Sequence, residues 1–234
     1  MADSIVNFGE WIAPENGDIH NVVIFFPPAT GDKGPQREEA LRLRNLGYAS
    51  LMYQPPYRRE DIGGIRDSVG ERRLWLRARA EFPLVTAAIR MKLKHATFKL
   101  FVAGKNLGGS TAAFAIDRSV SALIVSGAVP ILSAFWARSS HPVAVQSRAG
   151  VAATDVEDFE LNTREFDLIR TVPALKIPVL VQFGRNDEWI EREAFREFSG
   201  HVPANVRVSW TEDDHAMADP ASVAGRQAFL YMRR

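Results

Sequence analysis

Cysteine is absent from the 234 residues. Its absence excludes a disulfide framework, a thiol nucleophile and a thiolate metal site. An excess of charge of either sign is also missing, because 29 lysines and arginines stand against 28 acidic residues and the formal net charge is +1. Binding to nucleic acid or to an anionic membrane usually shows as a basic excess or patch, so neither partner is expected.

Long hydrophobic runs are missing as well. No run approaches the roughly 20 apolar residues that cross a bilayer as a helix. The N-terminus has neither the basic region nor the apolar core of a secretory signal. We therefore expect a cytoplasmic protein with no membrane partner. A homodimer is possible. Asp213, Asp214, His215 and Asp219 cluster in sequence, but a hard cation needs ligands from several loops, so no metal or other cofactor is predicted.

The residues that are present suit one compact domain over 1–234, since 46% are hydrophobic. Apolar runs predict strands at 21–26, 48–53, 98–103, 120–126, 179–183 and 206–210, with an outer strand over 5–12. Helical patterns alternate with them at 34–46, 71–94, 110–116 and 220–232, and Pro83 is expected to kink or split the second helix. The alternation predicts a doubly wound, mostly parallel sheet with helices on both faces.

The most informative motif is Gly104-Lys105-Asn106-Leu107-Gly108, between the strand at 98–103 and the helix that follows. This strand–turn–helix setting is that of the G-x-S-x-G nucleophile elbow, in which glycines permit a sharp turn that lifts the central side chain above the sheet. Here the central residue is Asn106. Its carboxamide is a poor nucleophile.

Two later positions extend the pattern. Asp187 stands in the turn after the strand at 179–183, and His215 stands on the loop after the strand at 206–210. The order of elbow, acid and histidine is that of the α/β-hydrolases. The chain therefore resembles this superfamily, in particular its small dienelactone-hydrolase-like and GxSxG-esterase members, with Asn at the elbow. The dienelactone-hydrolase branch uses Cys there, which this chain lacks.

The resemblance implies further site residues. An oxyanion hole would combine the Leu107 amide with that of Ala29 or Thr30, because the two prolines before them have no N–H. A cap-like insertion is expected over 131–175, where the alternation of strands and helices is interrupted. Its aromatic residues are candidates either for an apolar substrate cleft or for simple packing: Phe135, Trp136, Phe159 and Phe166.

The resulting prediction is a carboxylic-ester or related acyl hydrolase for a small acyl, ester or lactone-like ligand, with the nucleophile replaced by Asn106 in an inactivated or variant copy. The sequence leaves alternatives open. One is a lyase, cyclase or isomerase that uses His215 and Asp187 as a general base, with Asn106 as a hydrogen-bonding group. Another is a hydrolase-fold protein that binds a ligand without catalysis. An aspartate nucleophile changed to Asn would need halide-binding tryptophans that the sequence does not place.

Overall fold

The computed structural model describes residues 4–15, 18–28, 30–55, 64–94 and 96–234. The strands within these residues are β1 (Gly9–Ile12), β2 (Asn21–Phe26), β3 (Tyr48–Tyr53), β4 (Lys99–Lys105), β5 (Ala122–Ser126), β6 (Val179–Gly184) and β7 (Val206–Thr211). The α-helices are α1 (Gly34–Asn45), α2 (Ser68–Lys92), α3 (Leu107–Ala115), α4 (Leu132–Arg138), α5 (Pro142–Arg148), α6 (Ala153–Thr163), α7 (Leu168–Ala174), α8 (Arg192–Gly200) and α9 (Pro220–Tyr231). Short 3-10 helices are η1 (Ser4–Phe8), η3 (Gly64–Asp67) and η4 (Arg164–Phe166).

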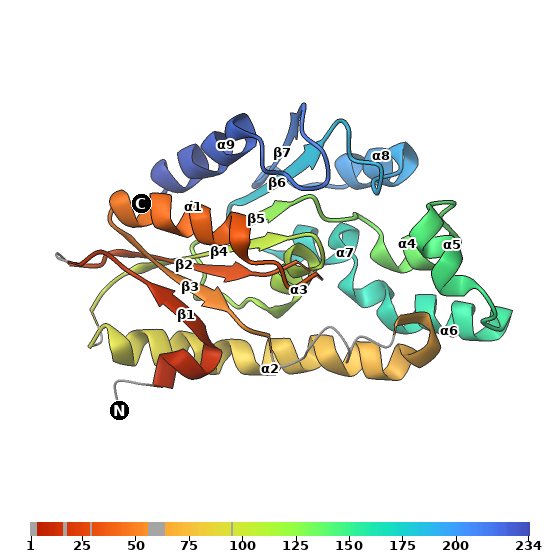
Figure 1. Cartoon of the computed structure of the whole chain (residues 1–234), viewed down its shortest axis with the longest axis horizontal. Helices are drawn as coiled ribbons and strands as arrows, with labels where there is room; N and C mark the ends of the chain where they lie inside the picture. Colours follow the sequence, from red (N-terminus) through yellow and green to blue (C-terminus); the bar gives the residue numbers. More distant parts are fainter. Residues whose placement is uncertain (1–3, 16–17, 29, 56–63, 95) are drawn as a thin grey trace.

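The strands form one sheet in the order β1-β3-β2-β4-β5-β6-β7. β1 pairs with β3 in antiparallel fashion, whereas the other pairs are parallel. Parallel neighbours require crossover connections, and helices between successive strands supply them. The predicted doubly wound, mostly parallel sheet is therefore confirmed (Figure 1).

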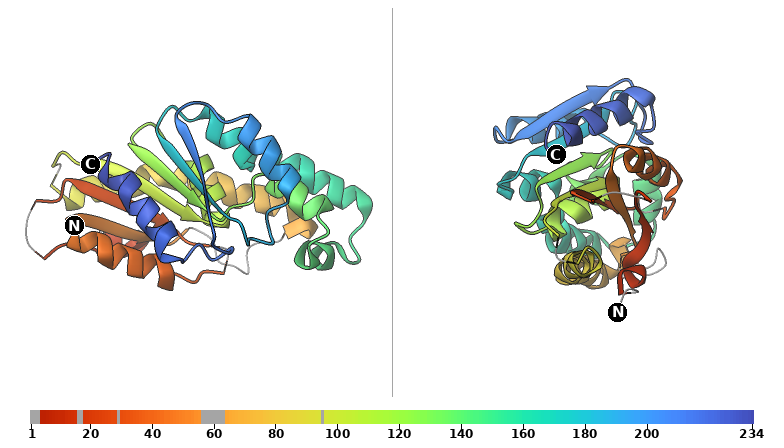
Figure 2. Two further views of the ribbon diagram at one scale, coloured as in Figure 1. Left: turned by 90° about the horizontal axis from the view of Figure 1, so that it is seen from above. Right: turned by 90° about the vertical axis from the view of Figure 1, so that its left-hand side faces the viewer.

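Both faces of the sheet are buried. Successive strand residues point to opposite faces, so Val22 and Ile24 pack toward α2, α3, α7 and α8, whereas Val23 and Phe25 pack toward α1 and α9. Helices accordingly lie on both sides of the sheet (Figure 2). Burial on both faces explains why the inner strands read as nearly continuous apolar runs.

The chain reverses its direction of winding between β2 and β4. These two strands are neighbours, but β2 is followed by α1 and β3 on one side, and β4 by α3 and β5 on the other. Loops beyond the carboxyl ends of strands separate at such a switch point and leave a crevice. The loop after β2 and the turn at Asn106 border this crevice.

The structure corrects one local expectation and excludes one of the two outcomes expected for Pro83. The expected outer strand over 5–12 begins as the 3-10 helix η1, and the strand itself spans Gly9–Ile12. Pro83 does not split its helix, because α2 runs continuously from Ser68 to Lys92. Pro83 lies on the exposed side of α2, where water can solvate the carbonyl that loses its N–H partner.

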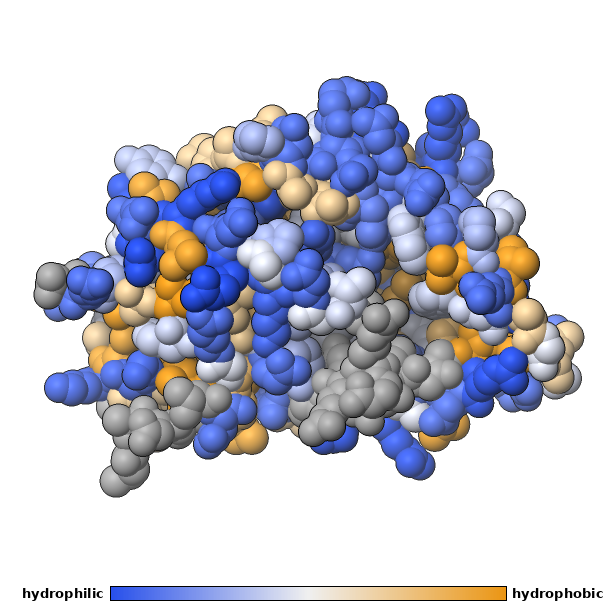
Figure 3. Space-filling model, in the orientation of Figure 1, coloured by the Kyte–Doolittle hydropathy of each residue, from blue (hydrophilic) through white to orange (hydrophobic). Residues whose placement is uncertain are grey.

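Residues 131–175 form α4, α5, α6, η4 and α7 between β5 and β6. Most of this segment lies at the end of the molecule toward which the parallel strands point (Figure 1). Hydrophobic side chains gather around a hollow between it and the body of the molecule (Figure 3). That the segment acts as a cap stays a prediction. In the described part of the chain, no helix combines the length and the apolar character that a membrane span requires.

Candidate active site

The turn at Asn106 has the geometry of a sharp elbow. Asn106 is the N-cap of α3 and has φ 52° and ψ −129°, a region that residues other than glycine rarely occupy. The neighbouring glycines permit the turn: a Cβ on Gly104 would overlap the backbone of Gly108, and one on Gly108 would overlap the carbonyl of Pro27. A Cβ on Gly109 would lie 2.9 Å from Val125 Cγ1. Strand, turn and helix therefore pack backbone to backbone.

The elbow faces a histidine–aspartate pair contributed by two later loops. Asp187 follows β6 and is buried, and His215 follows β7 with its side chain 21% exposed. His215 Nδ1 lies 3.0 and 2.9 Å from the two carboxylate oxygens of Asp187. The other ring nitrogen, Nε2, hydrogen-bonds with the Asn106 carboxamide. The structure thus brings together three residues that are 28 or more positions apart in sequence.

The hydrogen bonds around Asn106 determine the tautomer of His215. The Leu107 N–H can only donate, so the carboxamide atom that contacts it is the oxygen Oδ1. The carboxamide nitrogen therefore faces His215 Nε2, which must accept. Nδ1 then carries the proton and donates it to Asp187. This neutral tautomer, with Nε2 as the acceptor, is the one that a general base requires.

Buried polar contacts hold the loop that carries His215. The carboxylate of Asp213 accepts from the backbone N–H groups of Asp214 and Asp219, both at 2.9 Å. Arg226 on α9 donates to the carbonyl of Met217 at 3.2 Å. These contacts fix both ends of the loop, so the position of His215 does not depend on its own side chain alone.

A buried ion pair in turn anchors Arg226. Its Nη2 lies 2.8 Å from a carboxylate oxygen of Glu39 on α1, and its Nη1 lies 3.1 Å from the Gln182 side-chain oxygen. The two charged side chains are 8% and 5% exposed. Water therefore screens this pair little, and it links α1, β6 and α9 behind the histidine loop.

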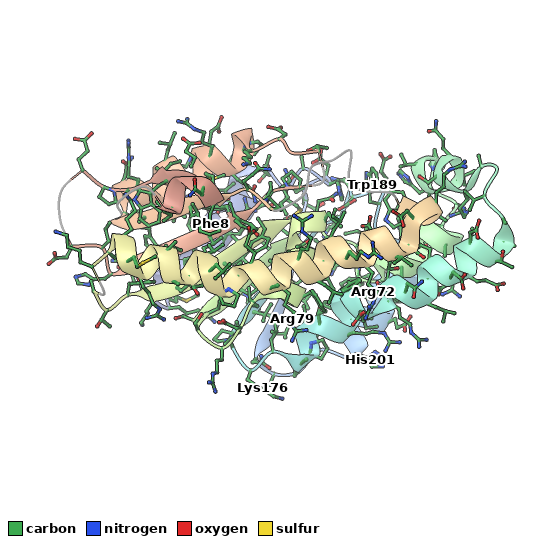
Figure 4. The ribbon with its side chains drawn as sticks, turned by 90° about the horizontal axis from the view of Figure 1, so that it is seen from below. Phe8, Arg72, Arg79, Lys176, Trp189 and His201 are labelled. Carbon is green, nitrogen blue, oxygen red and sulfur yellow. The ribbon has the colours of Figure 1, made fainter. Side chains whose placement is uncertain are left out.

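Trp189 covers the histidine–aspartate pair. Its backbone N–H donates to Asp187 Oδ1 at 2.9 Å, and its ring stacks on that of His215 with centroids 5.0 Å apart. Phe135 and His141, from α4 and the start of α5, pack against Trp189 at centroid distances of 5.6 and 4.4 Å. Trp189 accordingly lies where the body meets the helical segment (Figure 4).

A chamber of about 320 Å³ opens beside the elbow. Asn106, Leu107 and Ser110 border it from α3 and its N-cap. Predominantly apolar side chains form most of the remaining wall: Val129, Leu132, Phe135, Trp136, Phe159, Trp189 and Ile65. Polar groups come from Arg66, Glu71 and Ser147. An apolar space with a few convergent polar groups is the usual form of a small-molecule site.

A second cleft, surrounded mostly by polar side chains, is bordered by Asn106 and His215. Pro28, Thr30 and Lys105 border it. Burial lowers the pKa of Lys105, and the positive charge of Arg226 acts in the same direction. Among the expected oxyanion residues, Leu107 adjoins the elbow, and Thr30 borders this cleft. Ala29 lies outside the described residues. The oxyanion role of all three stays a prediction.

The predicted aromatic residues divide into two groups. Phe135, Trp136 and Phe159 line the chamber, whereas Phe166 does not. The ring of Phe166 is buried between Trp75, at 4.8 Å, and Phe114, at 4.6 Å, and so packs the segment onto α2 and α3. The expectation of a cleft position for Phe166 is corrected accordingly.

Sequence reasoning missed several chamber residues. Trp189 stands two positions after Asp187, and this proximity was a usable signal. Arg66, Glu71 and Ser147 come from elements distant in sequence, and no local pattern marks them. In the described ranges, no group of three or more histidine, aspartate or glutamate side chains is arranged to hold a metal ion.

Comparisons of this chain with known proteins found similarity to solved structures only. No protein-family model matches the sequence, and no curated protein matches it. Est1E from Butyrivibrio proteoclasticus, solved with ferulic acid bound, has a TM-score of 0.65 at 17% identity, covering 96% of this chain and 94% of that one. Dienelactone hydrolase from Anabaena variabilis has a TM-score of 0.61 at 15% identity, with 95% and 88% covered. An esterase domain from a Rhodothermus marinus protein has 0.61 at 15% identity, with 94% and 88% covered. The strand order, the elbow and these likenesses together show that the chain has the α/β-hydrolase fold.

Proposed function

We propose that this protein is an inactivated or variant copy of a carboxylic-ester or related acyl hydrolase, in which Asn106 replaces the nucleophile. One observation carries the proposal: His215 lies between Asp187 and Asn106, with one ring nitrogen directed at each. The similar solved structures include an esterase domain and a dienelactone hydrolase, which supports the same class of small acyl or lactone-like ligand.

In such a site a hydroxyl at position 106 would attack the acyl carbon and transfer its proton to His215 Nε2. Asp187 would hold the ring in the required tautomer and stabilise the imidazolium. The Leu107 amide, with a second donor from Thr30 or Ala29, would stabilise the oxyanion. In this chain the side-chain oxygen of Asn106 already accepts a hydrogen bond from the Leu107 N–H, and the carboxamide supplies no nucleophile. The natural chain is therefore expected to bind an acyl ligand without forming an acyl intermediate.

The substitution Asn106→Ser tests this proposal. Removal of the nucleophile from a serine protease costs about 10⁶ in turnover, so the Ser variant should hydrolyse p-nitrophenyl acetate at least about 10³-fold faster than the natural chain. It should also react with a fluorophosphonate probe. Asn106→Ala serves as the matched control, since it lacks both carboxamide and hydroxyl, and adding His215→Ala to the Ser variant should abolish the gain.

Background activity in a folded Asn106→Ser variant would contradict the proposal. Thermal unfolding of each variant establishes that it is folded. Such a result would direct attention to the non-hydrolytic enzyme or the ligand-binding protein that the sequence left open.

A further inference from the structure

The chamber beside the elbow is large enough for a substituted ring. A cavity of about 150 Å³ lined by leucine, isoleucine and phenylalanine can hold benzene. The chamber here is about 320 Å³, which leaves room for a side chain or a further ring substituent. Asn106 and Leu107 at the N-terminus of α3 form part of its wall, so a ligand inside it can reach the elbow.

Aromatic rings from three separate elements surround this space. Phe135 and Trp136 lie on α4, Phe159 on α6, and Trp189 after β6. Phe135 lies nearly parallel to Trp189, at an interplanar angle of 27°, and nearly perpendicular to Trp136, at 79°. A flat ligand ring can therefore meet one wall face to face and another edge to face. Such aromatic pairs are stabilised beyond the burial of area, and an aliphatic chain does not obtain this stabilisation.

Part of the chamber wall is polar. Arg66 in η3 and Ser147 in α5 contribute to this part of its wall. Arg66 Nη2 donates to the carbonyl of Ala149 at 2.9 Å, which holds the guanidinium against α5. A guanidinium has five N–H donors, so others are left for a ligand oxygen.

Opposite charges border this polar part of the wall. The carboxylate of Glu71 also lines the chamber, where it accepts from Trp75 Nε1 at 3.2 Å. A neutral hydroxyl matches both groups, because it can accept from a guanidinium and donate to a carboxylate. A second ligand carboxylate could bond only to Arg66 and an ammonium only to Glu71, whereas a hydroxyl can bond to both.

We propose that the chamber binds the acyl part of phenolic aromatic acids, with the ring between the aromatic walls and the hydroxyl at Arg66. The inference rests on the proposed function only in placing the acyl carbon beside Asn106. Arg66 is then a residue that determines specificity, and Trp136 is a wall that favours rings over chains.

Calorimetric titration of the natural chain tests the proposal without requiring hydrolysis. The probes are 4-hydroxycinnamate, cinnamate and octanoate, which compare a phenol, a bare ring and an aliphatic chain. We expect 4-hydroxycinnamate to bind about 5–10-fold more tightly than cinnamate, as one hydrogen bond allows. Both aromatic acids should bind more tightly than octanoate.

Two variants identify the groups responsible. Arg66→Gln should reduce the affinity for 4-hydroxycinnamate to that for cinnamate and leave cinnamate within about twofold. Arg72→Gln is the matched control, because Arg72 is an exposed arginine on α2 that pairs with Glu165 at 2.7 Å outside the chamber. Trp136→Leu should weaken both aromatic acids more than octanoate.

Three results would overturn the proposal: octanoate binding at least as tightly as the aromatic acids, an equal loss of both aromatic acids in Arg66→Gln, or no binding of either aromatic acid. These outcomes are independent of the ester test. Asn106→Ser could prove inactive while the natural chain binds 4-hydroxycinnamate through Arg66. That combination would contradict the hydrolase proposal and support the ligand proposal.

Discussion

At position 106 the backbone conformation and the residue type are in conflict. A φ of 52° with a ψ of −129° is unfavourable for any residue that has a Cβ. Such conformations cost about 1–3 kcal/mol and persist where the surrounding structure imposes them. Here the close packing of Gly104 and Gly108 against neighbouring backbone imposes the turn. The side chain of Asn106 is consequently held at Leu107 and His215 by the backbone, not only by its own hydrogen bonds.

This conflict predicts which of two small substitutions at position 106 gives the more stable protein. Asn106→Gly and Asn106→Ala both remove the carboxamide, but only Gly tolerates the conformation. We expect the Gly variant to have a free energy of unfolding about 1–3 kcal/mol above that of the Ala variant. Urea unfolding of the two proteins checks this. Equal stabilities would mean that the turn relaxes, and would argue against an elbow imposed by the sheet and α3.

At the scale of elements, the histidine loop depends on a contact between helices that are distant in sequence. Arg226 on α9 reaches Glu39 on α1 and the Met217 carbonyl in the loop. Removal of one partner from a buried ion pair leaves the other charge without compensation, and this costs about 3–5 kcal/mol. Replacing both partners by apolar residues costs much less.

We therefore expect Glu39→Leu and Arg226→Leu each to lower the free energy of unfolding by about 3–5 kcal/mol, and the double variant to lose clearly less than the sum. Denaturant unfolding of the four proteins measures this coupling. The exposed pair Arg37–Glu10, at 3.0 Å with side chains 51% and 46% exposed, is the control. Its coupling should stay below about 1 kcal/mol. A similar value for both pairs would contradict the role given to Arg226.

The sequence predicted those elements whose signal is local. The alternation of strands and helices follows from apolar periodicity, and the turn at Asn106 follows from glycine spacing, so both are visible in short windows. The chamber wall follows from tertiary packing, which short windows do not contain. Phe166 and Phe159 have similar sequence surroundings, yet Phe166 packs on Trp75 and Phe114 whereas Phe159 lines the chamber. The continuity of α2 at Pro83 was not visible for a related reason, since the exposed position of Pro83 is also a result of tertiary packing.

At the scale of the whole molecule, one buried carboxylate connects two helices of the segment over 131–175. Asp167 precedes α7 and is 2% exposed. It accepts from the backbone N–H of Ser133 at 2.9 Å and from its hydroxyl at 2.6 Å, at the start of α4. Leu168 and Val172 of α7 belong to the core of the sheet. Asp167 therefore fastens α4, which carries the chamber residues Phe135 and Trp136, to the body.

Burial raises the pKa of Asp167 to about 6 from 3.8, although the hydrogen bonds from Ser133 favour the charged form. The folded protein thus takes up a proton at higher pH than the unfolded chain. As the pH falls from 7 toward 4, this group adds to the free energy of unfolding, and the gain is lost again as the pH rises through 6.

In Asp167→Asn no such titration exists. The stability of the natural chain relative to Asp167→Asn should therefore increase by about 2 kcal/mol between pH 7 and pH 4.5, measured by urea unfolding. Asp158→Asn, which removes an exposed carboxyl on α6, is the matched control for the loss of a carboxyl. A difference between natural chain and Asp167→Asn that is independent of pH, or that changes in the opposite direction, would show that the carboxyl is not buried between α4 and α7.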